Sequence, residues 1–256
     1  MLESLQNLLQ LTQTEIVITF AVVFIAGIVR GFSGFALSAL VMAGLALIIP
    51  PSGLFAICLI LEACAGLLMI KGGFQNADMR IAWGLALGGM LGTPIGLYVT
   101  ASVPADISRM LALLLIMALA ILQLFRKSPA FLASTPGLYI SGVATGFATG
   151  IASVGGMVVA LYVLAQNAPA ARMRATLVMY LFLNLFAWSG WLLLGGFMDQ
   201  LAITRALALA PVALVGIFLG TLLFRPSLET FYKRFCLVLL MGLAAQGLIR
   251  LVPNFW

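Results

Sequence analysis

The stretch "RGFSGF", Arg30 to Phe35, interrupts what would otherwise be one long apolar segment. The chain from Ile16 to Ile49 is apolar on both sides of it and exceeds the roughly 20 residues that cross a hydrocarbon core as one helix. An arginine, a serine and two glycines at that position predict a helix that breaks inside the membrane. Irregular backbone at that depth is tolerated only against protein or a water-filled cavity.

Composition places the whole chain in lipid. Of its 256 residues 64% are hydrophobic and only 8% are charged, whereas a soluble domain is about half apolar and a quarter charged. The net charge of +6 comes from Arg and Lys between apolar segments, so we read it as a membrane-topology signal and predict no nucleic-acid partner. The three cysteines lie within apolar segments and are odd in number, which argues against a disulfide framework.

Ten apolar segments are separated by polar or basic residues. They lie at 16–29, 33–49, 52–70, 81–101, 108–125, 137–149, 155–165, 175–195, 203–224 and 235–251. A short helix on the membrane surface is expected before them, because leucines recur at helical spacing in "LESLQNLL".

Basic residues favour counting the pairs 16–49 and 137–165 as two passes, or one hairpin, each. The odd-numbered connections then hold ten Lys or Arg and the remaining positions three, and basic residues favour the cytoplasmic side. The ten are Arg30, Lys71, Arg80, Arg126, Lys127, Arg172, Arg174, Arg225, Lys233 and Arg234; the three are Arg109, Arg205 and Arg250. Both chain ends are therefore predicted to lie outside.

Segment length refines this topology. A helix over 137–149 would rise only about 20 Å, and one over 155–165 less, against a core of about 30 Å. We therefore predict a re-entrant hairpin with "GIASVGG" at its tip. The "RGFSGF" pair has longer arms, so it either spans twice or re-enters from the opposite side.

The two halves of the chain repeat each other at an offset of about 120–128. The matches are Gly27-x-x-x-Gly31 with Gly146-x-x-x-Gly150, "GGF" at 72–74 with 195–197, and Gly88 and Gly92 with Gly216 and Gly220. Each half holds five segments, an odd number, so the second must be inverted relative to the first. We predict an all-α integral membrane fold of two inverted repeats, 1–130 and 131–256, each opening with a broken or re-entrant helix, with a binding site between them.

The two breaks are candidates for an anion site. Half-helix N-termini present unpaired N–H groups and a positive dipole end, and a guanidinium adds a fork that suits oxyanions. The predicted substrate-binding residues are Arg30, Gly31, Ser33 and Gly34 in the first half, and Thr149, Gly150, Ser153, Gly155 and Gly156 in the second. The alternative is that Arg30 snorkels to the surface and the glycines only pack helices.

"GFSG" also matches the Gly-x-Ser-Gly motif of rhomboid-type intramembrane proteases. Such a serine needs a histidine as its base, and the sequence contains none. Without histidine, and with few cysteines, the pattern also predicts no metal site and no cofactor. The sequence is therefore not expected to be that of an enzyme.

Glu62 is the one acidic residue near the centre of an apolar segment, "ICLILEACAGLL". A carboxylate in lipid is costly and usually faces a cavity or a partner, so Glu62 is a candidate to carry a coupling proton. The alternatives are a protonated carboxyl bonded to another helix, or a static ion pair with an arginine. The repeat offset places Asn184 opposite Glu62, and we add it to the substrate-binding set.

The sequence resembles the TauE/SafE family of sulfite exporters. The resemblance rests on "GIVRGFSGFALSAL", on "GVATGFATGIASVGGMVVALYVLA" and on the following "APAARMRATLVMY", and it covers essentially the whole chain. It implies a prokaryotic inner-membrane transporter of sulfite, sulfonates or related anions, driven by an ion gradient. By motif position it implies site roles for Gly31, Ser33, Gly34, Gly150, Ser153, Gly155 and Gly156. The sequence departs from the family pattern in both motifs: "GGMVVALY" has Tyr162 where a proline is usual and fewer glycines, and Ala36 and Ser38 stand where glycine is more common. These departures concern the substrate more than the fold.

The sequence as a whole therefore predicts a secondary transporter that exports a small sulfur oxyanion or sulfonate by ion-coupled alternating access. A passive anion channel and an importer of small carboxylates are the alternatives. The predicted partners are the small anion, membrane lipid and a proton as coupling ion, and a homo-oligomer is compatible with the pattern.

Overall fold

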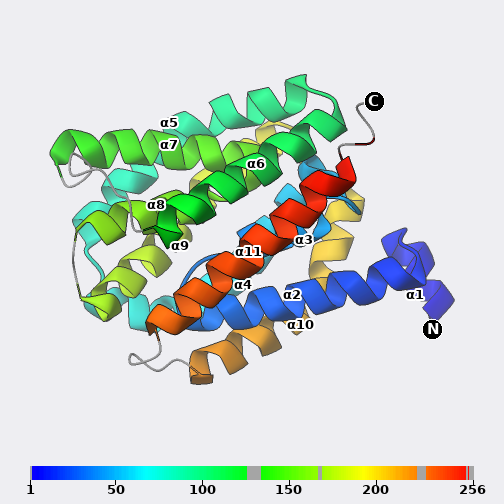
Figure 1. The fold of residues 1–256 in the computed structure, drawn as a ribbon, viewed down its shortest axis with the longest axis horizontal. Helices are drawn as coiled ribbons and strands as arrows, with labels where there is room; N and C mark the ends of the chain where they lie inside the picture. The colour runs from blue at the N-terminus through cyan, green and yellow to red at the C-terminus, as the bar shows by residue number, and fades with distance from the viewer. Residues whose placement is uncertain (1, 126–133, 167–168, 224–228, 252, 254–256) are drawn as a thin grey trace.

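A computed structural model describes residues 2–125, 134–166, 169–223, 229–251 and 253. Within these residues the chain forms eleven α-helices and no strand (Figure 1). They are α1 (Leu2–Leu9), α2 (Gln13–Ser33), α3 (Leu37–Leu45), α4 (Pro51–Asn76), α5 (Met79–Ser102), α6 (Ala105–Leu124), α7 (Thr135–Ala152), α8 (Gly155–Ala165), α9 (Ala170–Leu194), α10 (Gln200–Leu223) and α11 (Glu229–Leu251).

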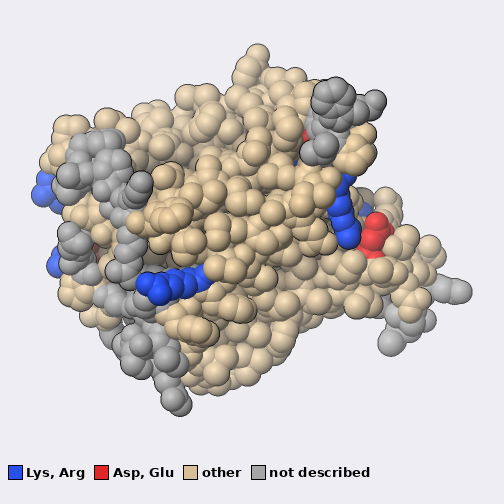
Figure 2. Space-filling view, in the orientation of Figure 1, with Lys and Arg blue, Asp and Glu red and all other residues tan. Residues whose placement is uncertain are grey.

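Seven of the described helices are long and apolar enough to cross a membrane: α2, α4, α5, α6, α9, α10 and α11. The prediction of an all-α, multi-pass membrane protein is therefore confirmed. Figure 2 shows the matching charge distribution on one face, where Lys, Arg, Asp and Glu lie toward the two ends and the middle of the face carries none. α1 and the last turn of α11 lie at the same end of the molecule (Figure 1).

Each predicted segment corresponds to one helix, but the lengths differ from those expected. α7 has 18 residues and rises about 27 Å, well beyond the predicted 137–149. The helices that follow the breaks are the short ones, with nine residues in α3 and 11 in α8, or about 14 and 16 Å. Each half thus opens with a long helix followed by a short one.

Glycines set two tight helix pairs at opposite sides of the bundle, α5 with α7 and α2 with α10 (Figure 1). A Cβ on Gly27 of α2 would lie 3.2 Å from the Cα of Gly216 in α10. A Cβ on Gly88 of α5 would lie 2.8 Å from the Cα of Gly142 in α7. Small residues at such crossings let two backbones approach closely, which drives helix association in lipid. The α5 glycines at this crossing therefore act in helix packing.

The larger of the remaining helix–helix contacts follow one rule. α4 packs on α9 and α6 on α11; α4 also contacts α10 as α9 contacts α5, and α3 contacts α11 as α8 contacts α6. If each helix from α2 to α6 is exchanged, in order, with its counterpart from α7 to α11, the same set of helix–helix contacts results. The candidate site described below lies where the short helices α3 and α8 begin, next to the packed helices α4 and α9.

Candidate functional site

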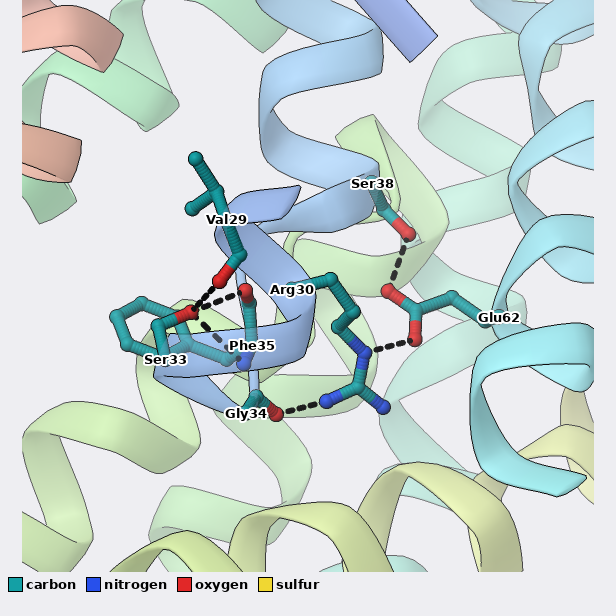
Figure 3. A network of polar contacts seen from close by, with 7 residues as sticks. All are labelled: Val29, Arg30, Ser33, Gly34, Phe35, Ser38 and Glu62. Carbon is teal, nitrogen blue, oxygen red and sulfur yellow. Dashed lines mark hydrogen bonds and ion pairs between the residues drawn. The ribbon is translucent and has the colours of Figure 1, made fainter. Parts of the chain in front are cut away.

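The first break lies between α2 and α3. Gly34 has φ 81° and Ala36 φ 74°, both left-handed, and this reverses the chain within three residues. Ser33 holds the turn from inside: its Oγ donates to the carbonyl oxygen of Val29 at 2.7 Å and accepts from the N–H of Phe35 at 3.2 Å (Figure 3). The Ser33 hydroxyl therefore stabilises the break, and it does not line the cavity described below.

The second break lies between α7 and α8. Ser153 adopts φ 54°, and its N–H bonds the carbonyl oxygen of Thr149 at 2.8 Å. A Cβ at Gly155 would lie 2.7 Å from the carbonyl oxygen of Thr145, so this turn has room only for glycine. The two breaks thus use different residues to reach the same result, a helix N-terminus deep in the bundle.

Both N-termini open on one buried space. Two small adjoining cavities, of about 30 and 10 Å³, share Ser38 at the start of α3, Ser153 and Gly156 at the start of α8, and Glu62 and Leu181 from α4 and α9. The first N–H groups of a helix have no partner within the helix and carry the positive end of its dipole. The cavities are therefore bounded from both halves by groups that suit an anion.

The Glu62 carboxylate lies at the centre of this site. Its Oε2 accepts from Arg30 Nε at 3.1 Å, and its Oε1 accepts from Ser38 Oγ at 2.9 Å (Figure 3). Arg30 Nη1 also donates to the carbonyl oxygen of Gly34, which caps the end of α2. Arg30 is fully buried, and Glu62 is 8% exposed.

This network fixes the charge of the site. A guanidinium and a carboxylate paired in a dry interior cancel each other, and both lose their water. Arg30 keeps one nitrogen, Nη2, buried without a hydrogen-bond partner among the described residues. Arg30 does not reach the surface, and the ion pair proposed as one alternative for Glu62 is present.

The second half contributes neutral polar groups. Asn184 of α9 lines the larger cavity, is 6% exposed, and its Oδ1 has no hydrogen-bond partner in the described part of the chain. Tyr180, one turn before it, is fully buried with its hydroxyl beside Thr149. A buried carbonyl oxygen without a donor is costly, so Asn184 Oδ1 is a group that a hydrogen-bond donor on a ligand, or a water, would satisfy.

Not every predicted site residue reaches the cavities. Thr149, Ser153, Gly155, Gly156, Asn184 and Glu62 line them, whereas Arg30, Gly31, Ser33, Gly34 and Gly150 do not. A Cβ on Gly31 would lie 2.6 Å from the backbone nitrogen of Thr221, and one on Gly150 2.5 Å from that of Leu97. These two glycines pack helices, as the alternative reading expected.

The lining residues that sequence reasoning missed include Ser38, Cys58 and Trp188. Ser38 is polar and lies five residues after Ser33, which was a usable signal. Cys58 lies one helical turn before Glu62, on the same face of α4. Trp188 lines the larger cavity and packs edge-on against Phe55, with ring centroids 5.5 Å apart.

Comparison with known proteins identifies the family of the chain. The family model for the sulfite exporters TauE/SafE matches residues 19–247, nearly the whole chain, and it describes a family of transporters rather than enzymes. The match includes both breaks, Glu62 and Asn184. Searches of curated proteins and of solved structures found no match. The chain therefore belongs to the TauE/SafE sulfite exporter family.

Proposed function

We propose that the protein is a secondary transporter that exports a small sulfur oxyanion, sulfite or a sulfonate, from the cytoplasm by ion-coupled alternating access. The observation that carries the proposal is the buried space where the N-termini of α3 and α8 meet beside an arginine–glutamate pair. Membership of a sulfite exporter family supports the substrate class. The small cavity suits an ion of a few heavy atoms.

The transport cycle would use two inverted repeats, residues 1–130 and 131–256, rocking about this site. Support comes from the exchange of partners between halves, in which α2 packs on α10 as α7 packs on α5. An inverted pair of repeats with broken helices at its centre is the arrangement that secondary transporters use for alternating access. In the topology that fits this arrangement, both ends of the chain lie on the outer side of the inner membrane.

Each predicted site group has a role in this proposal. The N–H groups at the starts of α3 and α8, with Ser153 and Asn184, bind the oxyanion in the cavity. Arg30 supplies the permanent positive charge, and Gly34 and Gly155 shape the two breaks. Gly31 and Gly150 act indirectly, because they set how closely α2 and α7 approach α10 and α5. Glu62 carries the coupling proton.

The testing experiment is a thermal-shift panel on purified protein with sulfite, methanesulfonate, thiosulfate, sulfate and succinate. A ligand at about 100 times its dissociation constant stabilises a protein by about 2.7 kcal/mol. We expect stabilisation by sulfite or methanesulfonate, its loss in Arg30→Ala, and its retention in Arg172→Ala, whose arginine pairs with Asp78 in a separate, more exposed pair. Stabilisation by succinate alone would contradict the substrate class.

A transport assay separates a carrier from a channel. Proteoliposomes loaded with labelled anion should release it faster when unlabelled substrate is present outside, because a carrier exchanges one ligand for another. A release rate that does not depend on the outside substrate would indicate a passive channel.

A further inference from the structure

The Glu62 carboxylate lies between Arg30 and the substrate cavity. Glu62 lines both parts of the cavity, whereas Arg30 is fully buried and lines neither. The carboxylate is anchored on both oxygens, by Arg30 Nε at 3.1 Å and by Ser38 Oγ at 2.9 Å. An anion in the cavity therefore meets a negative group before it meets the guanidinium, so the charge of Arg30 is not available to it in this arrangement.

The guanidinium nitrogen of Arg30 that has no partner indicates which kind of group would replace Glu62. Nη1 donates to the Gly34 carbonyl, while Nη2 is buried without a hydrogen-bond partner among the described residues. Nε and Nη2 form one edge of the guanidinium, and that edge binds two oxygens of an oxyanion at once. Glu62 takes only Nε. A tetrahedral or pyramidal oxyanion could take both nitrogens.

We propose that Glu62 is a built-in competitor of the transported anion. The anion replaces the Glu62 carboxylate on Arg30 Nε and also binds the free Nη2, and Glu62 takes up one proton as it leaves. The proton comes from water on the side to which the cavity is open, forms the carboxylic acid, and returns to water when the anion dissociates. This proposal rests on the proposed function and adds to it that anion and proton bind together and leave the cytoplasm together, one to one. The outward gradient of the anion then drives export, and the proton follows it.

Charge balance gives the physical reason. In the empty site the positive Arg30 and the negative Glu62 cancel. With a monovalent anion and a proton bound, Arg30 and the anion cancel and Glu62 is neutral. An anion without the proton would leave one uncompensated negative charge in a buried site, which is strongly unfavourable. Empty and loaded carriers are thus both neutral, and the transport step moves no net charge.

The other groups near Glu62 do not supply this proton. Among the described residues the further ionisable side chains in electrostatic contact with it are Cys58 on its own helix and Tyr180 on α9. Thiols and phenols hold their protons much more tightly than a carboxylate does, so neither gives one up to Glu62 at neutral pH. α3 contributes the Ser38 hydroxyl, and α2 contributes Arg30, which stays charged. The position opposite Glu62 in the second half is Asn184, which cannot titrate, so one proton is expected for each anion.

Proton uptake on binding tests the proposal directly. Methanesulfonate is the probe, because sulfonic acids stay ionised across the working range and any proton taken up must bind the protein. We expect wild-type protein in weak buffer to take up one proton for each methanesulfonate bound. Affinity should fall about tenfold per pH unit where the empty site is deprotonated. Binding without proton uptake would overturn this inference alone.

Variants keep the test specific. Glu62→Gln should bind methanesulfonate with pH-independent affinity and no proton uptake, while Asp106→Asn, an acid of a more exposed pair with Arg109, should behave as wild type. Ser38→Ala keeps both charges but loosens the competitor, so it should bind more tightly than wild type at pH 8. Unchanged pH dependence in Glu62→Gln, or no gain in affinity in Ser38→Ala, would overturn the proposal.

Proteoliposomes give an independent readout. A pH gradient should drive wild-type transport, and a membrane potential at equal pH should not; in Glu62→Gln this dependence should be reversed. Voltage-driven transport by the wild type would overturn the inference. Failure of the wild type to bind sulfite, methanesulfonate or thiosulfate at all would instead overturn the proposed substrate class, and this inference with it.

Discussion

Gly88 of α5 and Gly142 of α7 lie back to back. A Cβ on Gly88 would lie 2.8 Å from the Cα of Gly142, and a Cβ on Gly142 would lie 2.9 Å from the Cα of Gly88. Neither position has space for a side chain unless the two backbones separate. Because α7 also carries the break that begins α8, the spacing of this pair positions one wall of the cavity.

Gly142→Val should therefore destabilise the protein by about 1–3 kcal/mol, the usual cost of adding methyl groups to a packed interface. Its melting temperature in detergent should fall clearly below that of the wild type. The matched control is Gly242→Val in α11, where a Cβ would meet nothing within 4 Å. Equal melting temperatures for the two variants would contradict the assigned role of the α5–α7 crossing.

Loss of Arg30 should be far more costly than loss of a surface arginine. Arg30→Ala leaves the Glu62 carboxylate buried without its partner, and breaking such a pair typically costs about 3–5 kcal/mol. Arg172→Ala breaks a pair whose arginine side chain is 55% exposed and should cost less than about 1 kcal/mol. Chemical or thermal unfolding in detergent compares the two.

A double variant shows whether Arg30 and Glu62 contribute to stability as a pair. Arg30→Met combined with Glu62→Met removes both charges, so it should be more stable than Arg30→Ala alone. Additive losses of stability from the two positions would show that Arg30 and Glu62 do not act as a pair.

Asn184→Asp should weaken anion binding. The side chain lines the cavity with an oxygen that has no hydrogen-bond partner in the described residues, and the substitution adds a negative charge there with little change of shape. We expect the dissociation constant for sulfite to rise ten- to a hundredfold, equivalent to about 1.4–2.8 kcal/mol. Titration calorimetry measures it, and Asn184→Ala, which adds no charge, should lose less affinity.

Cys58 offers a native probe of the cavity. A variant that keeps Cys58 as its one cysteine should react slowly with a small anionic thiol reagent. Because Cys58 lines the cavity, bound methanesulfonate should slow this reaction severalfold. A variant that keeps only Cys236 should stay unlabelled, since Cys236 is buried and lines neither described part of the cavity. If methanesulfonate left the labelling rate of Cys58 unchanged, this cavity would not be the substrate-binding site.

The helical fold and the positions of the breaks could be predicted because they depend on local sequence. Apolar segments of membrane length and the polar interruptions "RGFSGF" and "GIASVGG" are visible without any tertiary information. The length of α7 was underestimated at both ends: Thr135 and Pro136 are typical of a loop, and residues 150–152 were assigned to the tip of the predicted hairpin. Proline at the start of a helix is in fact favourable, since its missing N–H would have no partner there.

The candidate site could be predicted only in part. A glycine that admits a ligand and a glycine that admits a neighbouring helix are the same residue in a sequence, so Gly31 and Gly150 were placed in the binding set. Their spacing, each four residues after another glycine, is typical of helix packing and was the available signal. The contact between Arg30 and Glu62 joins two helices across 32 positions, and nothing local specifies it.

The crossing of α2 with α10 has a consequence for how the chain is made. Helices α2 and α10 lie near opposite ends of the sequence, so at 5–20 residues per second the glycine face of α2 leaves the ribosome roughly 10–40 s before its partner exists. During that interval it is exposed to lipid or to the insertion machinery. α5 meets α7 much sooner, since only α6 separates them. The α5–α7 pair can therefore assemble while synthesis continues, and the α2–α10 pair closes the bundle last.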